Sequence, residues 1–420
     1  MMGTRIVRSI CVLVVAGCLM TPQAVRADPA QQVTREEVRA ALVSGARYAA
    51  DFLIGPDGKA RGDYDMIAGR WYDYEPAWHT GQVIFGLVEA YRVTGDETFL
   101  AAARRAGDWW IGLEFKEPHK LAGLINAYHG DRLGRLINFT TITDGTNGIF
   151  ELSRETGDAK YADTATRSGR WLLANTYIPD EGLFYNIIDP DTGEIWKDRS
   201  PHHEDLANPT LLQVARPNSE GYLFKDMCEH TGDQRYCQVF LDVADKLLER
   251  QGEHGMWMDF EPNHPDKGRF HPRFNLWYAE SLMEAYDLTG RKAYLEAALK
   301  TARGMARAQR KSGVIHYVNY LDGRTDRSSL TGSAVSFAGV VWLRLQDYGV
   351  GDEFDDNIDR AVRWVIAHRF AEDHPDPNLR GAFLETRLRT TQGKPRIRMR
   401  DIATAFGLRF LAAYYRRPES

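Results

Sequence analysis

Four acidic residues stand at or near the expected beginnings of helices, where a pair of them could perform acid–base chemistry. They are Asp144, Glu220, Glu280 and Asp401. Hydrolysis of a glycosidic bond needs one carboxyl group to protonate the leaving oxygen and a second to activate water or attack the sugar. We predict Asp144 as the general acid, because burial among apolar neighbours favours the protonated form, and Glu220 as the base or second carboxylate. Asp144 and Asp401 could instead be plain helix caps, and Glu280 a hydrogen-bonded core acid.

Histidines in the same segments allow a different chemistry. His79 follows Trp78 at an expected helix opening, His203 lies in the run SPHHED, and His271 lies in GRFHP. A lyase would use His or Tyr to remove the C5 proton of a uronic acid, and Asn or Arg to neutralise its carboxylate. The residues that could supply such a set are His79, His203, Asn218, Asn275, Arg273 and Tyr320. Adjacent residues rarely point at one ion, so we expect no metal at SPHHED, and no other cofactor.

Arginines and tryptophans in these segments favour an anionic sugar as the ligand. Arg269, Arg273, Arg387, Arg389, Arg396, Arg398 and Arg400 crowd two short segments, and Arg216 stands in a third. Arginine pairs bidentately with carboxylates and sulfates, although salt bridges to nearby acids would explain the same residues. Trp78 and Trp277 could stack on pyranose rings, with Asn275 positioning the ring, while tryptophans deeper in the helical segments pack in the core.

A repeated turn defines the elements that must position these residues. The turns are Thr94-Gly95-Asp96, Thr156-Gly157-Asp158, Thr231-Gly232-Asp233, Thr289-Gly290-Arg291 and a degenerate copy at Val350-Gly351-Asp352. Glycine ends one helix in the left-handed conformation, and the aspartate that follows it in four of the five turns caps the next helix by accepting its free amide hydrogens. Each repeat is longer than two helices and a tight turn require, and the extra residues always lie between one helix pair and the next. One end of the array therefore has tight turns, and the other end carries long loops.

The helix count predicts that the array closes on itself. Five first helices are expected near 79–93, 145–155, 218–230, 275–288 and 331–348, each followed by a second helix. Two helices remain, Thr34–Ile54 and Asp401–Tyr415, and the second is too apolar to be the exposed cap of an open solenoid. If these two pair, six hairpins form a ring. We predict an all-α fold, a single (α/α)6 toroid over residues 28–420 with small β-hairpin loops at one end.

The six hairpins and their TGD turns resemble the six-hairpin glycosidases and their polysaccharide-lyase relatives. The segment ITDGTNGIFELSRETGD is faintly similar to that of unsaturated glucuronyl hydrolases, whose catalytic aspartate opens such a helix. That resemblance implies a cavity at the long-loop end, lined by the beginnings of the first helices. It also implies a catalytic role for Asp144. The flanks of that family's motif are absent here.

The N-terminus is predicted to be a signal peptide over residues 1–27, with Arg5 and Arg8 before an apolar run. Cleavage after Ala27 would free the protein, whereas the VAGC sequence ending at Cys18 resembles a lipobox and would leave a lipid anchor. We therefore expect a periplasmic or secreted protein with no membrane-spanning helix in the folded chain. Export permits a disulfide between Cys228 and Cys237, which flank one turn; two buried thiols are the alternative.

These observations together predict an exported carbohydrate-active enzyme. Its expected substrate is a uronic-acid-containing poly- or oligosaccharide, and glycoside hydrolysis by paired carboxylates is favoured over β-elimination by a lyase. A non-catalytic polysaccharide-binding toroid and an epimerase or cyclase on the same scaffold remain alternatives. The chain carries 53 basic and 58 acidic residues, and it lacks the broad basic face that a nucleic-acid-binding protein needs.

Overall fold

The computed structural model describes residues 33–130, 133–201, 206–217, 222–260, 262–391 and 394–418. Within these residues no helix is long and apolar enough to cross a membrane. The predicted signal peptide, including Cys18, lies outside the described residues, as do Glu220, Asn218 and His203.

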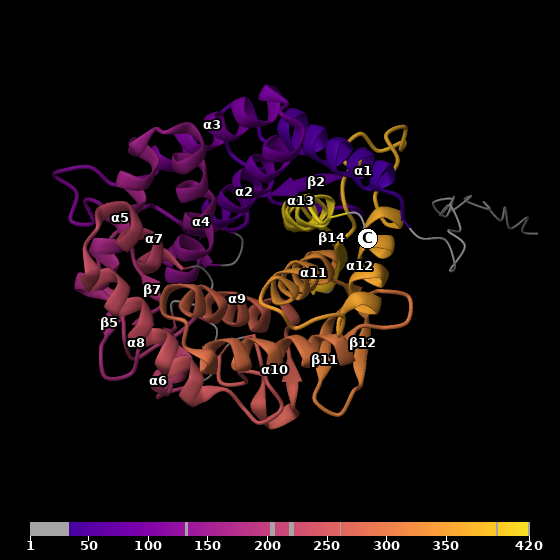
Figure 1. The fold of residues 1–420 in the computed structure, drawn as a ribbon. Coiled ribbons are helices and arrows are strands. Elements are labelled where there is room, and N and C mark those ends of the chain that lie inside the picture. The colour runs from indigo at the N-terminus through magenta and orange to yellow at the C-terminus, as the bar shows by residue number, and fades with distance from the viewer. Residues whose placement is uncertain are drawn as a thin grey trace, which may run out of the picture.

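Six helical hairpins form a closed ring, which is the (α/α)6 toroid predicted from the turns (Figure 1). The inner helices are α2 (Pro76–Thr94), α4 (Phe139–Thr156), α7 (Leu223–Thr231), α9 (Pro272–Thr289), α11 (Gly332–Asp347) and α13 (Ile402–Tyr415). The outer helices are α1 (Arg35–Tyr48), extended by a π-helical turn at Ala49–Leu53, α3 (Glu97–Ile111), α5 (Ala159–Asn175), α8 (Gln234–Arg250), α10 (Lys292–Ala308) and α12 (Asp355–Ala367). A short helix, α6 (Leu211–Val214), lies in a loop.

Four of the five predicted turns have the predicted glycine geometry. At the degenerate copy, Val350-Gly351-Asp352, the prediction is wrong, because α11 ends at Asp347 and α12 begins at Asp355 with no side-chain cap. Gly95, Gly157, Gly232 and Gly290 all adopt positive φ values between 68° and 73° at the ends of inner helices. The aspartate after each of the first three glycines accepts a hydrogen bond from the backbone of the next helix. These local caps explain why the hairpins could be located from sequence.

Helices α1 and α13 pack antiparallel and close the ring, as predicted. Arg35, at the start of α1, stacks on Tyr415, the last residue of α13. It also donates to the carbonyl of Arg417, just beyond the end of α13. Further along, Gly45 of α1 faces Leu408 near the middle of α13. The first and last helices of the chain therefore form the sixth hairpin.

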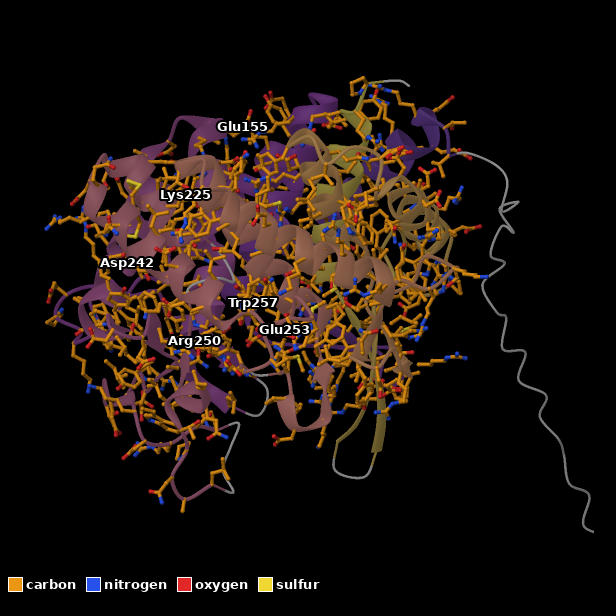
Figure 2. All side chains as sticks on the ribbon, turned by 60° about the horizontal axis from the view of Figure 1, so that its bottom comes forward. Glu155, Lys225, Asp242, Arg250, Glu253 and Trp257 are labelled. Carbon is orange, nitrogen blue, oxygen red and sulfur yellow. A yellow bond between two sulfur atoms is a disulfide. The ribbon has the colours of Figure 1, made fainter. Side chains whose placement is uncertain are left out.

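Short antiparallel strands gather at the long-loop end, opposite the tight turns. In Figure 2, Glu155 near the end of α4 lies toward the top, whereas Trp257 and Glu253, in the loop after α8, lie lower, nearer the strands. The largest sheet has the order β10 (Arg269–Phe270), β11 (His316–Tyr320), β12 (Thr325–Leu330), β13 (Thr386–Thr391), β14 (Lys394–Arg400), β1 (Asp63–Asp65) and β2 (Arg70–Tyr72). A second sheet joins β3 (Tyr128–Gly130), β4 (Gly134–Asn138), β7 (Ile187–Ile188) and β8 (Ile195–Trp196), and a third joins β5 (Tyr177–Ile178), β6 (Leu183–Tyr185) and β9 (Ala215–Arg216).

Two long loops, residues 180–198 and 255–272, carry Asp-Pro or Pro-Asp turns between short apolar runs and test the prediction of small β-hairpin loops. Residues 180–198 contain the paired strands β7 and β8, as predicted. Residues 255–272 do not form a hairpin of their own. They contain a 3-10 turn at Pro265–Lys267 and the single strand β10, which pairs instead with β11.

Ion pairs tie the inner helices together at the tight-turn end. Arg92 of α2 binds Glu151 of α4 at 2.8 Å, and the next pairs around the ring are Arg154–Asp226 at 2.7 Å and Lys225–Glu284 at 2.9 Å. The circuit continues through Arg344–Glu284, Arg409–Glu280 and Arg416–Glu89, which reach α11, α13 and again α2. Glu280 is therefore a paired core acid, the alternative already considered for it.

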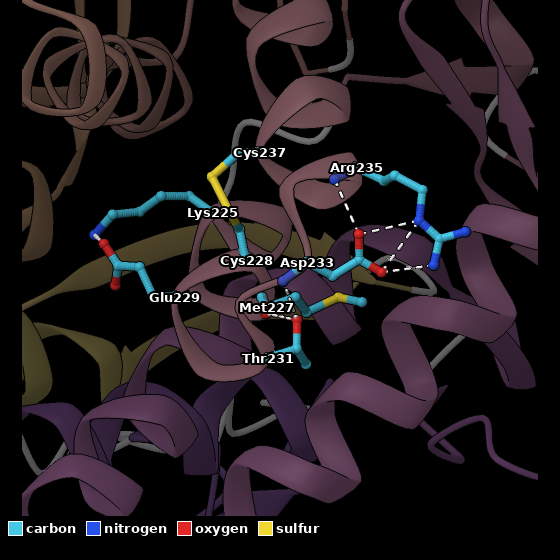
Figure 3. Close-up of a disulfide and its surroundings, with 8 residues drawn as sticks. All are labelled: Lys225, Met227, Cys228, Glu229, Thr231, Asp233, Arg235 and Cys237. Atoms are coloured by element: carbon cyan, nitrogen blue, oxygen red, sulfur yellow. Dashed lines mark hydrogen bonds and ion pairs between the residues drawn. A yellow bond between two sulfur atoms is a disulfide. The ribbon is translucent and has the colours of Figure 1, made fainter.

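A disulfide joins Cys228 and Cys237 across the turn between α7 and α8, with 5.3 Å between their α-carbons (Figure 3). Asp233 lies in the same turn, where it caps α8 and pairs with Arg235. The covalent link fixes the shortest inner helix to its outer partner.

Candidate active site

Close packing of two inner helices positions Asp144. A side chain at Gly81 of α2 would collide with the backbone of Gly145, and one at Gly148 would collide with the backbone of Gly81. The amide of Gln82 donates to the carbonyl of Asp144 and, at 3.1 Å, to Asn147 Oδ1. Glycines in the sequence DGTNG thus let α4 lie directly against α2, which holds Asp144 in one place.

Asp144 is not a helix cap. Helix α4 begins at Phe139, earlier than the predicted start at residue 145, so Asp144 lies more than a turn inside it. Burial of Phe139 and Ile142 outweighs the weak helix propensity of the threonines around them. The side chain of Asp144 is only 3% exposed, and its charge acts favourably on Arg273 across the ring.

Arg273 is held between two indole rings at the start of α9. Its guanidinium carbon lies 5.0 Å from the ring centre of Trp78 and 5.2 Å from that of Trp277. Its Nη1 donates to Ser333 Oγ at 2.9 Å and approaches Glu385 Oε1 at 3.4 Å. Burial lowers the pKa of Arg273, while Glu385 opposes that change. The result is a fixed, desolvated cation facing Asp144.

Several donors around Arg273 are buried without a hydrogen-bond partner among the described residues. They are Arg273 Nε, Trp78 Nε1 and Trp277 Nε1. Buried donors are nearly always satisfied, so a group of them in one place indicates a site that ligand or solvent oxygen atoms occupy. Trp277 is 1% exposed and packs on Phe337 and Phe406, so it offers its N–H rather than an open stacking face.

His79 belongs to a network of polar contacts that joins α2 to β14 and to Asp401. Its Nδ1 contacts Asp401 Oδ1, and Arg400 Nη2 lies 3.4 Å from its Nε2. Because arginine can only donate, Nε2 accepts and Nδ1 carries the proton toward Asp401. Arg400 also donates to Asp63 Oδ1 at 2.9 Å. With both ring nitrogens engaged and no exposed surface, His79 has the geometry of a positioning residue rather than of a free base.

Asp401 and Arg398 complete this network. The side chain of Asp401 does not cap its own helix and instead accepts from the backbone N–H of Gly62 at 3.0 Å. Arg398 Nη1 lies 3.4 Å from Asp63 Oδ2. Asp401 therefore holds the residue before β1 against α2, whereas Arg398 joins β14 to β1.

Three other residues predicted to bind substrate, Asn275, Tyr320 and Arg216, have different surroundings. The side chain of Asn275 bonds the backbone of Trp257 and of His271, so it positions a loop. Tyr320 lies under Arg324 beside a separate surface cavity of about 250 Å³. Arg216 is buried in β9, and its Nη1 has no partner among the described residues.

Sequence reasoning missed Asp63, Glu385 and the pair formed by Glu75 and His129. Glu75 precedes α2 with φ of 43°, the one non-glycine residue with positive φ that the structure describes, and its Oε1 lies 3.3 Å from His129 Nε2. Tyr74 contacts both His79 and His129 edge-on. Such backbone strain is often retained near functional sites. All four acids and bases lie outside the helix openings to which the sequence search was confined.

Within the described residues, no group of three or more His, Cys, Asp or Glu side chains is arranged to hold a metal ion. His203 and the rest of residues 202–205 lie outside that part of the chain.

Comparison with solved structures decides the fold. The cellobiose 2-epimerase from Bacillus thermoamylovorans matches with a TM-score of 0.70 at 14% identity, over 91% of this chain and 99% of that one. The fold is the six-hairpin toroid of these enzymes. An unsaturated glucuronyl hydrolase specific for heparin matches with a TM-score of 0.65 at 13% identity, over 90% of this chain and 96% of that one.

A second hydrolase shows the same relationship. The unsaturated glucuronyl hydrolase from Bacillus sp. GL1 has a TM-score of 0.62 at 17% identity and covers 91% of this chain and 97% of its own. No protein-family model matches the chain, and no curated protein matches its sequence. At these identities the similarity establishes the fold, and the reaction must be inferred from the site.

Proposed function

We propose that this protein is a glycoside hydrolase that cleaves a uronic-acid-containing poly- or oligosaccharide. One observation carries the proposal: a buried carboxylic acid, Asp144, lies within electrostatic range of a desolvated cation, Arg273, among donors that lack partners within the described residues. That combination suits a sugar bearing a carboxylate. The names of two solved neighbours, which are unsaturated glucuronyl hydrolases, support the same substrate class.

The roles of the two facing groups follow from their chemistry. Arg273 would bind the carboxylate of the sugar, with the indole N–H groups of Trp78 and Trp277 donating to oxygen atoms of the same unit. Once the sugar carboxylate neutralises Arg273, the buried Asp144 would bind a proton and transfer it to the leaving oxygen as the bond to the anomeric carbon breaks. Water would add to that carbon and lose a proton to a base. Glu220 remains our candidate for that base.

The engaged nitrogens of His79 favour hydrolysis over β-elimination. A lyase needs an unprotonated nitrogen or phenolate free to take the C5 proton, and the Nε2 of His79 faces Arg400 instead. His203 and Tyr320 remain the other candidates for such a base. We further propose export to the periplasm or beyond, from the sequence of residues 1–27, with a lipid on Cys18 as the alternative to a free protein. Mass spectrometry of the mature N-terminus distinguishes the two.

A product assay tests the reaction directly. The protein is incubated with uronate oligosaccharides, both saturated and with an unsaturated end, while reducing ends and the ultraviolet absorbance of unsaturated uronates are followed. New reducing ends without a rise in absorbance indicate hydrolysis, whereas a rise indicates a lyase. An altered sugar stereocentre without new reducing ends indicates an epimerase, and binding without any product indicates a non-catalytic toroid.

The matched variant is Asp144→Asn, which keeps the shape of the side chain and removes the acid. We expect saccharide binding to survive and turnover to fall about 100-fold or more. An unchanged rate in Asp144→Asn would remove Asp144 from the mechanism.

A further inference from the structure

The hairpin of β13 and β14 places arginines directly opposite one another. Its register pairs Arg387 with Arg398 and Arg389 with Arg396. Like charges at opposed positions of an antiparallel pair are destabilising. The pair of Arg387 and Arg398 therefore requires compensation by anions.

The compensation within the protein is one-sided. On the β14 side, Asp63 lies 3.4 Å from Arg398, and Asp65 lies 3.8 Å from Arg396. On the β13 side, Arg387 makes no ion pair with any residue that the structure describes, and its guanidinium carbon stacks 4.6 Å from the ring centre of Tyr317. The positive charge of Arg387 is therefore unmatched.

A cavity of about 200 Å³ opens beside this unmatched charge. Arg387, Arg269, His271, Tyr317 and Ser328 are among the residues that line it. Its volume is well above the ~30 Å³ occupied by one water, so it has room for a polyatomic ion. The acid in its wall, Asp326, accepts from the backbone N–H of Ser328 at 2.9 Å and so serves its own turn.

His271 supplies a directed donor to the same cavity. Its side chain is 3% exposed, and its Nδ1 accepts from the backbone N–H of Arg273 at 3.2 Å, so the ring proton resides on Nε2. That Nε2 has no partner among the described residues. Burial, with Arg273, Arg387 and two further arginines, holds the pKa of His271 well below its usual range, which keeps the ring neutral. His271 can therefore donate to an oxyanion but cannot act as a base.

We propose that this cavity is a second oxyanion subsite, which binds a carboxylate or sulfate on the sugar unit next to the one that Asp144 acts on. His271 Nε2–H and the guanidinium of Arg387 are its direct donors, and Tyr317 holds both, since its ring lies 4.3 Å from that of His271 and under Arg387. Arg273, two residues after His271 on α9, links this subsite to Asp144. The inference rests on the proposed function for its substrate, a saccharide with two anionic units.

Binding is tested first, independently of turnover. Protein labelled with ¹⁵N in its histidine rings is titrated with sodium sulfate and, separately, sodium acetate, and the His271 Nε2–H signal is followed. We expect a saturable shift with at least one anion and at least a tenfold weaker affinity in Arg387→Gln. The control is Arg324→Gln, which removes an exposed arginine paired with Asp322 and should leave the affinity unchanged.

Turnover then identifies the source of the oxyanion. Substrates matched except for a neutral, carboxylated or sulfated neighbouring unit are compared by kcat/KM. Arg387→Gln should abolish the preference for one charged substrate and leave the neutral one unaffected. An unshifted His271 signal, or equal losses in Arg387→Gln and Arg324→Gln, would overturn the subsite. Anion binding at His271 without hydrolysis of any substrate would instead count against the proposed function.

Discussion

Removing the negative charge of Glu385 should destabilise the protein far more than removing a comparable surface charge. Glu385 has no exposed surface, and its Oε2 accepts from the backbone N–H of Ser333 at 2.9 Å while its Oε1 faces Arg273. Glu385→Gln leaves the guanidinium of Arg273 buried, with Asp144 as its remaining nearby anion. The amide NH₂ of the new glutamine also points toward either the backbone N–H of Ser333 or the guanidinium of Arg273, and both of these groups are donors.

The expected size follows from the burial of both partners. Breaking a buried ion pair by removing one charge typically costs about 3–5 kcal/mol, and Asp144 and Ser333 favour the lower end. An unfolding entropy of about 2.1 cal/mol/K per residue, over roughly 390 residues, gives ~0.8 kcal/mol/K. A loss of about 3 kcal/mol therefore lowers Tm by about 4 °C.

Calorimetry with two further variants makes the test specific. Asp322→Asn breaks a pair whose side chains are 53% and 70% exposed, so it should change Tm very little. Glu385→Gln combined with Arg273→Met removes both buried charges and should recover part of the loss. If Glu385→Gln lowers Tm no more than Asp322→Asn, the reasoning about Arg273 as a desolvated cation is refuted.

Three other perturbations have defined outcomes. Gly148→Ala should cost about 1–3 kcal/mol and lower turnover, because α4 must move away from α2 and carries Asp144 with it; full activity at reduced Tm would separate packing from the site. Cys228→Ser opens the loop closed by Cys237 and should cost about 2–3 kcal/mol by urea unfolding, whereas added reductant should have no effect on that variant. Burial would raise the pKa of Glu284, but its basic partners on α7 and α11 outweigh it and hold the pKa below the usual 4.5. Its contribution is thus present above pH 4.5 and lost as pH falls further, and Glu284→Gln should flatten that decline in Tm.

The fold could be predicted because its determinants are local. Each glycine that ends an inner helix and each aspartate that caps the next acts within a few residues, so the turns at 94–96 and 156–158 were recognisable in isolation. Closure followed from the apolar helix at 402–415, which had no other partner. Helix starts were less accurate, since burial rather than propensity extends α4 back to Phe139.

Only those residues of the candidate site that lie on inner helices could be predicted from the sequence. Asp144 and Arg273 lie on inner helices, so a search along these helices found both. Glu385 and Asp63 lie in segments far away in sequence that carry no periodic pattern, and their pairing with arginines depends on how the loops fold over the ring. A sequence shows that an arginine needs an anion but does not show which acid reaches it.

The two ends of the toroid use charge in different ways, and this difference supports locating the chemistry at the long-loop end. At the tight-turn end, Arg92, Arg154 and Arg344 each bind carboxylates of neighbouring inner helices, so their charges serve the closure of the ring. One carboxylate oxygen of Asp226 lacks a partner there among the described residues, and burial raises the pKa of that acid to about 8 in spite of Arg154 and Lys225. At the long-loop end, the groups without partners among the described residues include four donors, Arg273 Nε, Trp78 Nε1, Trp277 Nε1 and His271 Nε2. A structure keeps such donors buried at a cost, which a bound saccharide with acceptor oxygens would offset.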